Sequence, residues 1–191
     1  AAKQGKFQPF MNAMFEAYGS NGPAYDEMFD GAELRPPYLR LRSSLDTMTT
    51  PDLVSRVEAL QSRYLDQGVT FDIGGEERAF PLDILPRVIE MDTWSTIEKG
   101  VQQRVRCLEL FLADVYDAGV VFDDGVIPRE VIATSSHYHR EAAGVRPPNG
   151  VRVHVSGIDL IRDNEGEFRV LEDNVRVPSG VSYVMTNRRA I

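Results

Sequence analysis

The feature that most constrains the fold is a long run of regularly spaced apolar residues in the middle of the chain. These side chains recur every three or four positions, at Trp94, Ile97, Val101, Val105, Leu108, Leu112 and Val115. This spacing predicts one amphipathic helix that runs from Asp92 or Thr93 to about Asp117 and ends at Gly119. The opposite side of the helix carries polar residues that we expect to face solvent: Glu98, Lys99, Gln102, Gln103, Arg104 and Arg106.

Shorter elements are predicted on both sides of this helix. A hydroxyl cap at Thr50, followed by Pro51 and Asp52, is typical of a helix start, and Gly68 is a suitable stop for that helix. The other expected elements are a hairpin over residues 69–80, a short strand at 120–122 and a short helix at 128–131. Because helices and hairpins are interleaved without a regular βαβ pattern, we expect an α+β fold with packed helices and a mixed or antiparallel sheet.

The first 45 residues differ from the rest of the chain. We expect residues 1–45 to form an irregular N-terminal arm and residues 46–191 to form the main domain. Within the arm, Met and Phe residues from Phe7 to Tyr18 have helical spacing before Gly19. This short amphipathic helix packs either on the main domain or against a partner protein, and both alternatives stay open.

Composition excludes several classes of function. The chain has 191 residues, of which 29 are acidic and 21 basic, and its net charge of −8 argues against a nucleic-acid binder that depends on phosphate contacts. No apolar run approaches the roughly 18 residues of a membrane span, and the N-terminus lacks the apolar segment of a signal peptide. The single cysteine, Cys107, excludes an internal disulfide, which fits a cytoplasmic location. We expect its thiol to be buried.

The most informative local pattern is a predicted hairpin near the C-terminus. Two apolar strands, residues 157–162 and 168–174, flank the polar turn Asp163–Gly166. A four-residue turn pairs Arg162 with Glu167, and counting back from there sets Asp159 opposite Val170 and Gly157 opposite Glu172. Side chains two residues apart on one strand share a face, as do directly opposed ones.

This count places Asp159, Glu172 and Asn174 on one face of the hairpin, with Gly157 leaving room above the sheet for a bulky ligand. Two carboxylates and an amide oxygen form a hard ligand set that suits Mg²⁺ or Mn²⁺ and not zinc. The alternative is an exposed strand end that merely carries acidic side chains. The alternate residues His137 and His139 indicate a metal more weakly, because no third ligand lies nearby in the sequence.

These residues resemble the metal-binding hairpin of ATP-grasp ligases. The resemblance is carried by Asp159, by Glu172 and Asn174 in a Glu-x-Asn pattern, and by the Pro-Ser-Gly turn at 178–180. The longer strings look like one branch in particular, the circularly permuted ATP-grasp proteins related to glutathionylspermidine synthase. They are Gly157–Arg162, Leu171–Tyr183, Asn187–Arg188, Phe80–Arg87, Trp94, Gln103–Arg104 and Phe111–Tyr116, and the resemblance covers about residues 30–191.

The resemblance implies an ATP- and magnesium-dependent ligase that joins a carboxylate to an amine. Asp159, Glu172 and Asn174 would hold Mg²⁺ (or Mn²⁺) against the phosphates of ATP. Arg176 would pair with a carboxylate or phosphate as a catalytic residue. The turn residues Ser179, Gly180 and Ser182 would face the substrate at the start of a helix, where backbone amides favour anions.

The same resemblance implies that further parts complete the nucleotide site. In the permuted branch, the lid and the adenine pocket follow the metal hairpin, so we expect this chain to be an N-terminal portion with a partial fold. We expect ATP turnover only when the remainder of the domain, or a partner protein, completes the site. A different class of function also stays open: an acidic protein-interaction module, or a module that binds a divalent ion structurally.

Overall fold

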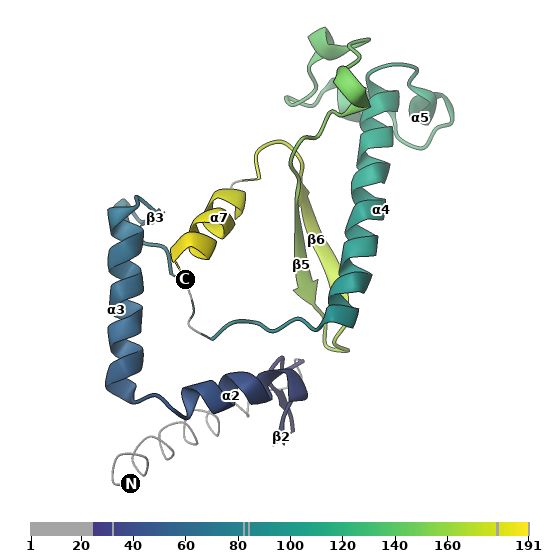
Figure 1. Ribbon diagram of the computed structural model, residues 1–191. Helices are drawn as coiled ribbons and strands as arrows, with labels where there is room; N and C mark the ends of the chain where they lie inside the picture. Colours follow the sequence, from purple (N-terminus) through teal and green to yellow (C-terminus); the bar gives the residue numbers. More distant parts are fainter. Residues whose placement is uncertain (1–24, 32, 82, 84, 179, 191) are drawn as a thin grey trace. The chain divides into compact units, whose positions relative to one another are not determined.

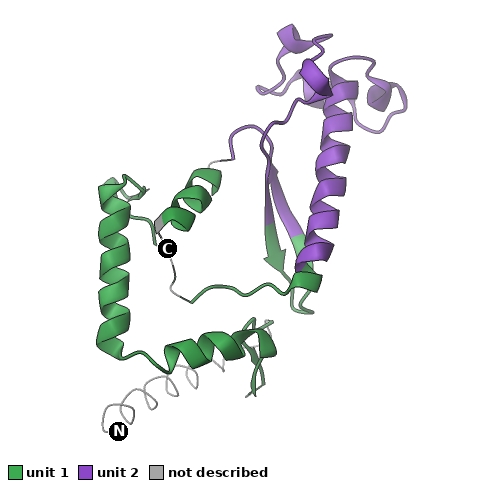
Figure 2. Cartoon of the chain, viewed as in Figure 1, with its two compact units in different colours: residues 1–93, 160–169, 179–191 green, residues 94–159, 170–178 purple. Residues whose placement is uncertain are grey.

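A computed structural model describes residues 25–31, 33–81, 83, 85–178 and 180–190 (Figure 1). The chain forms two compact units (Figure 2). Unit 1 contains residues 1–93, 160–169 and 179–191, and unit 2 contains residues 94–159 and 170–178. The boundary crosses the C-terminal hairpin, whose turn belongs to unit 1 and whose acidic end belongs to unit 2.

Unit 1 contains helices and short two-stranded sheets. Its elements are β1 (Phe29–Asp30), β2 (Glu33–Leu34), the 3-10 helix η2 (Pro36–Tyr38), α2 (Leu39–Leu45), α3 (Thr50–Asp66), β3 (Thr70–Ile73), β4 (Glu76–Ala79) and α7 (Gly180–Ala190). β1 pairs with β2, and β3 pairs with β4, both antiparallel. The predicted hairpin over residues 69–80 is therefore confirmed.

The start of α3 shows how local sequence sets a helix boundary. Thr49, one residue before the expected cap, is the N-cap, and its hydroxyl accepts the backbone N–H of Asp52 at 3.3 Å. The Asp52 carboxylate accepts the Thr49 N–H at 2.8 Å, which completes a capping box. Pro51 lies in the first turn, where no intrahelical donor is lost.

Two small clusters of buried side chains form the core of unit 1. One consists of Met28, Phe29, Tyr38 and Leu45, so this part of the predicted irregular arm is ordered. In the other, Tyr64 and Val69 are buried with Phe80 and Tyr183 packed against them. The rings of Phe80 and Tyr183 stack with their centroids 4.6 Å apart, which attaches α7 to the β3–β4 hairpin. The predicted amphipathic helix at residues 7–18 lies outside the described residues.

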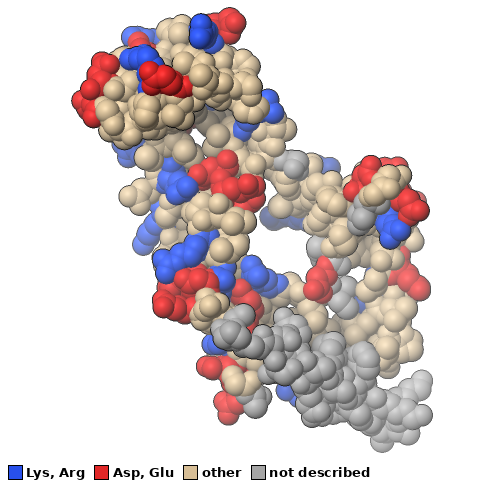
Figure 3. Space-filling view, turned by 180° about the vertical axis from the view of Figure 1, so that it is seen from behind, with Lys and Arg blue, Asp and Glu red and all other residues tan. Residues whose placement is uncertain are grey.

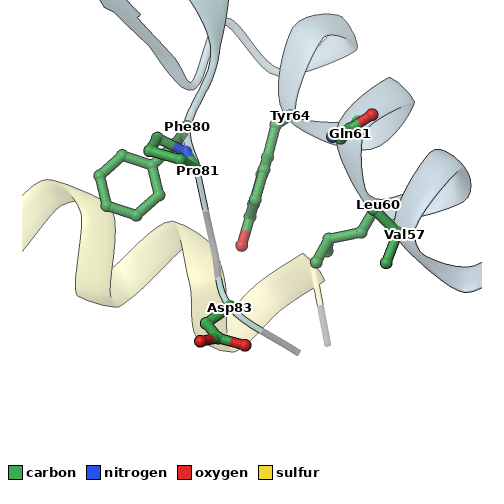
Figure 4. A pocket seen from close by; sticks show the side chains of 7 residues that line it. All are labelled: Val57, Leu60, Gln61, Tyr64, Phe80, Pro81 and Asp83. Atoms are coloured by element: carbon green, nitrogen blue, oxygen red, sulfur yellow. The ribbon is translucent and has the colours of Figure 1, made fainter. Parts of the chain in front are cut away.

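A pocket of about 370 Å³ lies between α3 and the segment that follows β4 (Figure 4). Apolar side chains make up much of its wall, and its lining residues are Val57, Leu60, Gln61, Tyr64, Phe80, Pro81 and Asp83. The hydroxyl of Tyr64 is buried without a hydrogen-bond partner among the described residues. Burial raises the pKa of this phenol. None of the residues predicted to be functional lines this pocket.

Unit 2 is built on α4 (Met91–Val115), whose first turn lies in unit 1 and which confirms the predicted long helix. It continues with α5 (Val120–Asp123), α6 (Arg129–Ala133), the 3-10 helices η3 (Arg140–Ala142) and η4 (Pro148–Gly150), and the strands β5 (Gly157–Arg162) and β6 (Phe168–Asn174), which form a two-stranded sheet. Helices combined with small antiparallel sheets agree with the predicted α+β class.

Two predictions within unit 2 are wrong. Residues 120–122 are helical, because the Asp114 carboxylate accepts the N–H groups of Val120 and Val121 at 2.9 and 2.8 Å and Gly119 turns the chain with φ of 70°. This arrangement satisfies the free donors of a helix start. Cys107 is exposed, not buried as expected.

Two global properties follow from the described residues. None of their helices is long and apolar enough to cross a membrane. On the face that Figure 3 shows, acidic and basic side chains are interspersed, and the described residues there form no continuous basic surface.

Candidate functional site

The turn that joins β5 and β6 is held by its own polar groups. The Asp163 N–H donates to the Glu167 carbonyl at 2.9 Å, and the Gly166 N–H donates to the Asp163 carbonyl at 3.0 Å. The Asp163 carboxylate also accepts the N–H groups of Glu165 and Glu167 and pairs with Arg169 at 2.7 Å. These contacts to Arg169 and to the backbone lower the pKa of Asp163.

This turn corrects the predicted register. The closing pair is Asp163 with Glu167, whereas the sequence count paired Arg162 with Glu167. A regular ladder counted from the observed turn would put Asp159 and Glu172 on opposite faces. Their side chains nevertheless meet, so we infer that the ladder contains an irregularity of the kind a β-bulge introduces, which is common beside functional sites.

The three predicted metal ligands lie together at the end of the hairpin away from the turn. The Asn174 Nδ2 group donates to Asp159 Oδ2 at 3.3 Å and to Glu172 Oε1 at 3.0 Å. We call this cluster of Asp159, Glu172 and Asn174 the acid end of the hairpin. All three residues belong to unit 2, so their proximity does not depend on the placement of the two units.

The electrostatics of the acid end indicate that its carboxylates repel each other. The pKa of Asp159 is raised, first by a hydrogen bond with Glu172, and then by burial and by the charge of Glu172. The hydrogen bond from Asn174 acts in the opposite direction. A nearby cation would favour the ionised form of both carboxylates.

The donor set fits a hard divalent cation. The described residues contain no cluster of three His, Cys, Asp or Glu side chains that could hold a metal. The acid end offers two carboxylates, with the amide of Asn174 beside them. Its nitrogen faces both carboxylates, and rotation of the amide by half a turn would present its oxygen to the same point. Two carboxylates and one amide oxygen leave further positions for water and phosphate oxygens, as Mg²⁺ prefers.

The space above Gly157 is already occupied. A Cβ atom at this position would lie 3.1 Å from the Cβ of Pro178 and 3.7 Å from the Cβ of Asn174. The expectation that Gly157 leaves room for a ligand opposite Glu172 is therefore wrong. The glycine instead lets the segment after β6 pack against the start of β5.

Sequence reasoning missed the residue that fastens the acid end to α4. Arg104, which we expected to be solvated, donates from Nε and Nη2 to the two carboxylate oxygens of Asp173, both at 2.6 Å. This ion pair raises the pKa of Arg104 and lowers that of Asp173. The acid end therefore lies beside α4 (Figure 1). In the sequence, Arg104 is an arginine on the polar side of a helix and part of one string that carries the family resemblance, and neither feature indicates Asp173 as its partner.

The other predicted functional residues belong to other segments of the chain. Arg176 is exposed just after β6, in unit 2. Gly180 and Ser182 lie in the first turn of α7, in unit 1, and Ser179 lies outside the described residues. His137 and His139 are exposed on a non-strand segment, which gives them no common strand face.

Comparison with known proteins places this hairpin in a family. The sequence profile of a family described as a circularly permuted ATP-grasp matches residues 86–191, which include α4, both strands of the hairpin and α7. This match covers more than half of the chain. The chain therefore belongs to the circularly permuted ATP-grasp family.

Similar proteins come from several bacteria. An uncharacterized protein of Mycobacterium leprae is 54% identical over 169 residues, which cover 88% of this chain and 30% of that protein. An uncharacterized Synechocystis protein is 39% identical over 175 residues, which cover 89% of this chain and 36% of that protein. A Frankia casuarinae protein, provisionally named glutamate–cysteine ligase 2-2, is 39% identical over 181 residues. These residues cover 92% of this chain and 20% of that protein. The chain thus spans about a third or less of the length of these relatives.

Proposed function

We propose that this chain supplies the metal-binding hairpin of an ATP- and magnesium-dependent ligase that joins a carboxylate to an amine. The observation that carries the proposal is the meeting of Asp159, Glu172 and Asn174 at one end of a β-hairpin. Membership of the circularly permuted ATP-grasp family supports it. The provisional name of the Frankia relative, a glutamate–cysteine ligase, supports the same class of reaction.

In this reaction a substrate carboxylate attacks the γ-phosphorus of ATP, the bond to ADP breaks, and an acyl phosphate forms. The amine then attacks the acyl carbon and phosphate leaves, which forms an amide. Substrates are small molecules or peptides that carry these groups. More specifically, we propose a substrate specificity like that of glutathionylspermidine synthase.

The acid end would hold Mg²⁺ through the Asp159 and Glu172 carboxylates and the Asn174 amide oxygen. When bound, Mg²⁺ neutralises the charge that develops on the transferred phosphoryl group. Because ionised carboxylates are the ligands, cation binding at the acid end would oppose the rise in the pKa of Asp159 that Glu172 causes. Arg176 and the turn at 179–182 would contact anionic groups of the substrates.

The remaining parts of the nucleotide site would come from additional sequence or from a partner chain. This step rests on the small share of each relative that the chain covers. We expect the 191-residue chain to bind a divalent cation. We expect ATP turnover only when the chain is part of a complete domain.

Calorimetry with Mg²⁺ and a non-hydrolysable ATP analogue tests the proposal, with the 191-residue chain and a complete family member as samples. In this chain Glu172→Gln, and in the complete protein the same change at the matching glutamate, should weaken metal binding about 100-fold or more, because an amide replaces a charged ligand. The complete protein should also lose metal-dependent nucleotide binding. If this substitution leaves both affinities unchanged, the hairpin is only part of the sheet and the chain is better explained as an acidic interaction module.

A further inference from the structure

Arg104 engages the residue that lies between two of the proposed metal ligands. In β6, Asp173 separates Glu172 from Asn174, and its side chain is 18% exposed. Both of its carboxylate oxygens accept hydrogen bonds from the Arg104 guanidinium at 2.6 Å. A bidentate pair of this kind fixes both the distance and the orientation of the two side chains.

This clamp also sets the direction of the neighbouring side chains. Successive residues of a strand point to opposite faces, so holding Asp173 against α4 turns Glu172 and Asn174 away from α4 and toward Asp159. Without the clamp, rotation of the end of β6 would separate the ligands. The residue after Asn174 is already outside the strand, so β6 has no ladder beyond this point to hold its orientation.

Helix α4 holds the other strand as well. Five residues after Arg104, the Glu109 carboxylate accepts the backbone N–H of Arg152 at 3.0 and 3.1 Å, and also that of Val153. These residues lead into β5, which carries Asp159. The same helix therefore holds the approach to one strand and the end of the other, and a long helix gives both contacts a common rigid support.

We propose that Arg104 is a positioning residue for the divalent-cation site, acting through Asp173 on Glu172 and Asn174. The inference rests on the proposed function in one respect, that the acid end binds a cation. Groups that orient metal ligands contribute to metal affinity although they do not touch the metal, and their loss weakens binding about 10- to 100-fold.

The sign of the effect separates positioning from simple electrostatics. Removing Arg104 takes away a positive charge and leaves Asp173 unpaired, so electrostatics alone would make a divalent cation bind more tightly, by up to about tenfold. Loss of positioning has the opposite effect. Weaker binding by an Arg104 variant therefore reports misplaced ligands.

Electron paramagnetic resonance of Mn²⁺ provides the test, because the signal of the free ion falls as it binds. We expect Arg104→Ala in the 191-residue chain to weaken Mn²⁺ binding about 10- to 100-fold. Arg104→Lys keeps the charge but loses the bidentate geometry, so its affinity should lie between those of the Ala variant and the unaltered chain. Exchange of the pair, Arg104→Asp with Asp173→Arg, should restore much of the lost affinity.

Arg146→Ala is the matched control, because Arg146 pairs with Asp117 at 3.6 Å on the surface of unit 2 and touches none of the ligands. It should leave the affinity unchanged, and thermal unfolding should show that every variant is folded. Unchanged or tighter binding by both the Ala and Lys variants would overturn the inference while the site itself stands. An absence of Mn²⁺ binding by the unaltered chain would overturn the proposed site, and the inference with it.

Discussion

Asp159 and Asp163 lie four residues apart in the sequence, and their surroundings have opposite effects on them. Asp163 pairs with Arg169 and accepts two backbone N–H groups of the turn, so its pKa is lowered. Asp159 meets another carboxylate, Glu172, and its pKa is raised. The first carboxylate stabilises the local fold, and the second adds a repulsion that the fold has to offset.

The same contrast extends to the side chains around each carboxylate. Beside the turn, the Arg162 guanidinium lies over the rings of Tyr25 and Phe168, at 4.7 and 4.6 Å from their centroids, and pairs with Glu27 at 2.6 Å. At the acid end, the residue that forms an ion pair is Asp173, which is adjacent to the predicted ligands Glu172 and Asn174. Asp163 thus has its own counter-charge, whereas the amide of Asn174 is the group that contacts both Asp159 and Glu172. Unneutralised carboxylates held together against repulsion are typical of a functional site.

The largest expected effect on stability comes from filling the turn. Gly166 has φ of 86°, and a Cβ atom there would lie 2.6 Å from the Tyr25 ring. Gly166→Ala should therefore destabilise the chain by about 2–4 kcal/mol, which urea unfolding can measure. The matched variant at the other end, Gly157→Ala, has an ordinary backbone conformation and a 3.1 Å contact with Pro178, so about 1 kcal/mol is expected. Equal losses would show that the turn is not the more tightly packed end.

What could be predicted from the sequence was local. Helix α4 follows from a single periodic pattern. The grouping of Asp159, Glu172 and Asn174 was expected within one hairpin, although the register used in the count was wrong. Residues 120–122 were assigned to the wrong element because β-branched and aromatic residues favour strands, and the Asp114 carboxylate that caps a helix there lies six residues upstream.

Contacts between distant segments could not be predicted. Arg104 and Asp173 are 69 residues apart, and a charged residue on a helix surface gives no sign of such a partner. The packing of Pro178 over Gly157 depends on how the chain leaves β6, which residue counting does not describe. The register count failed at the turn, because it paired Arg162 with Glu167 whereas Asp163 bonds to Glu167.

Opposite changes in stability should follow when each aspartate is neutralised at pH 7. Asp163→Asn removes the charge that pairs with Arg169 and weakens the hydrogen bonds to the turn, so the melting temperature should fall by a few degrees. Asp159→Asn removes the repulsion with Glu172, so the melting temperature should rise slightly in metal-free buffer. Calorimetric unfolding measures both. A fall for both variants would mean that Asp159 is a structural carboxylate like Asp163.

The smallest effect, and the most specific, is on the pH dependence of stability. A group with a raised folded pKa binds its proton more tightly in the folded state, so Asp159 contributes stability below its ordinary value of 3.8, and this is lost as the pH rises through the raised value. Asp163 acts in the opposite sense: its contribution is present above 3.8 and is lost as the pH falls through the lowered value.

Urea unfolding between about pH 3 and 7 should therefore give different profiles for the two variants. The free energy of unfolding of Asp159→Asn should increase relative to that of the unaltered chain as the pH rises above 3.8. Asp163→Asn should be less stable than the unaltered chain near neutral pH, and this difference should shrink at acidic pH. Arg104 lowers the pKa of Asp173, so both variants should still lose some stability at low pH as Asp173 takes up a proton.

Addition of Mg²⁺ should remove the stability difference between Asp159→Asn and the unaltered chain. A bound cation stabilises the ionised carboxylates in the unaltered chain and not in Asp159→Asn. If Mg²⁺ stabilises both proteins equally, the acid end is not the cation site.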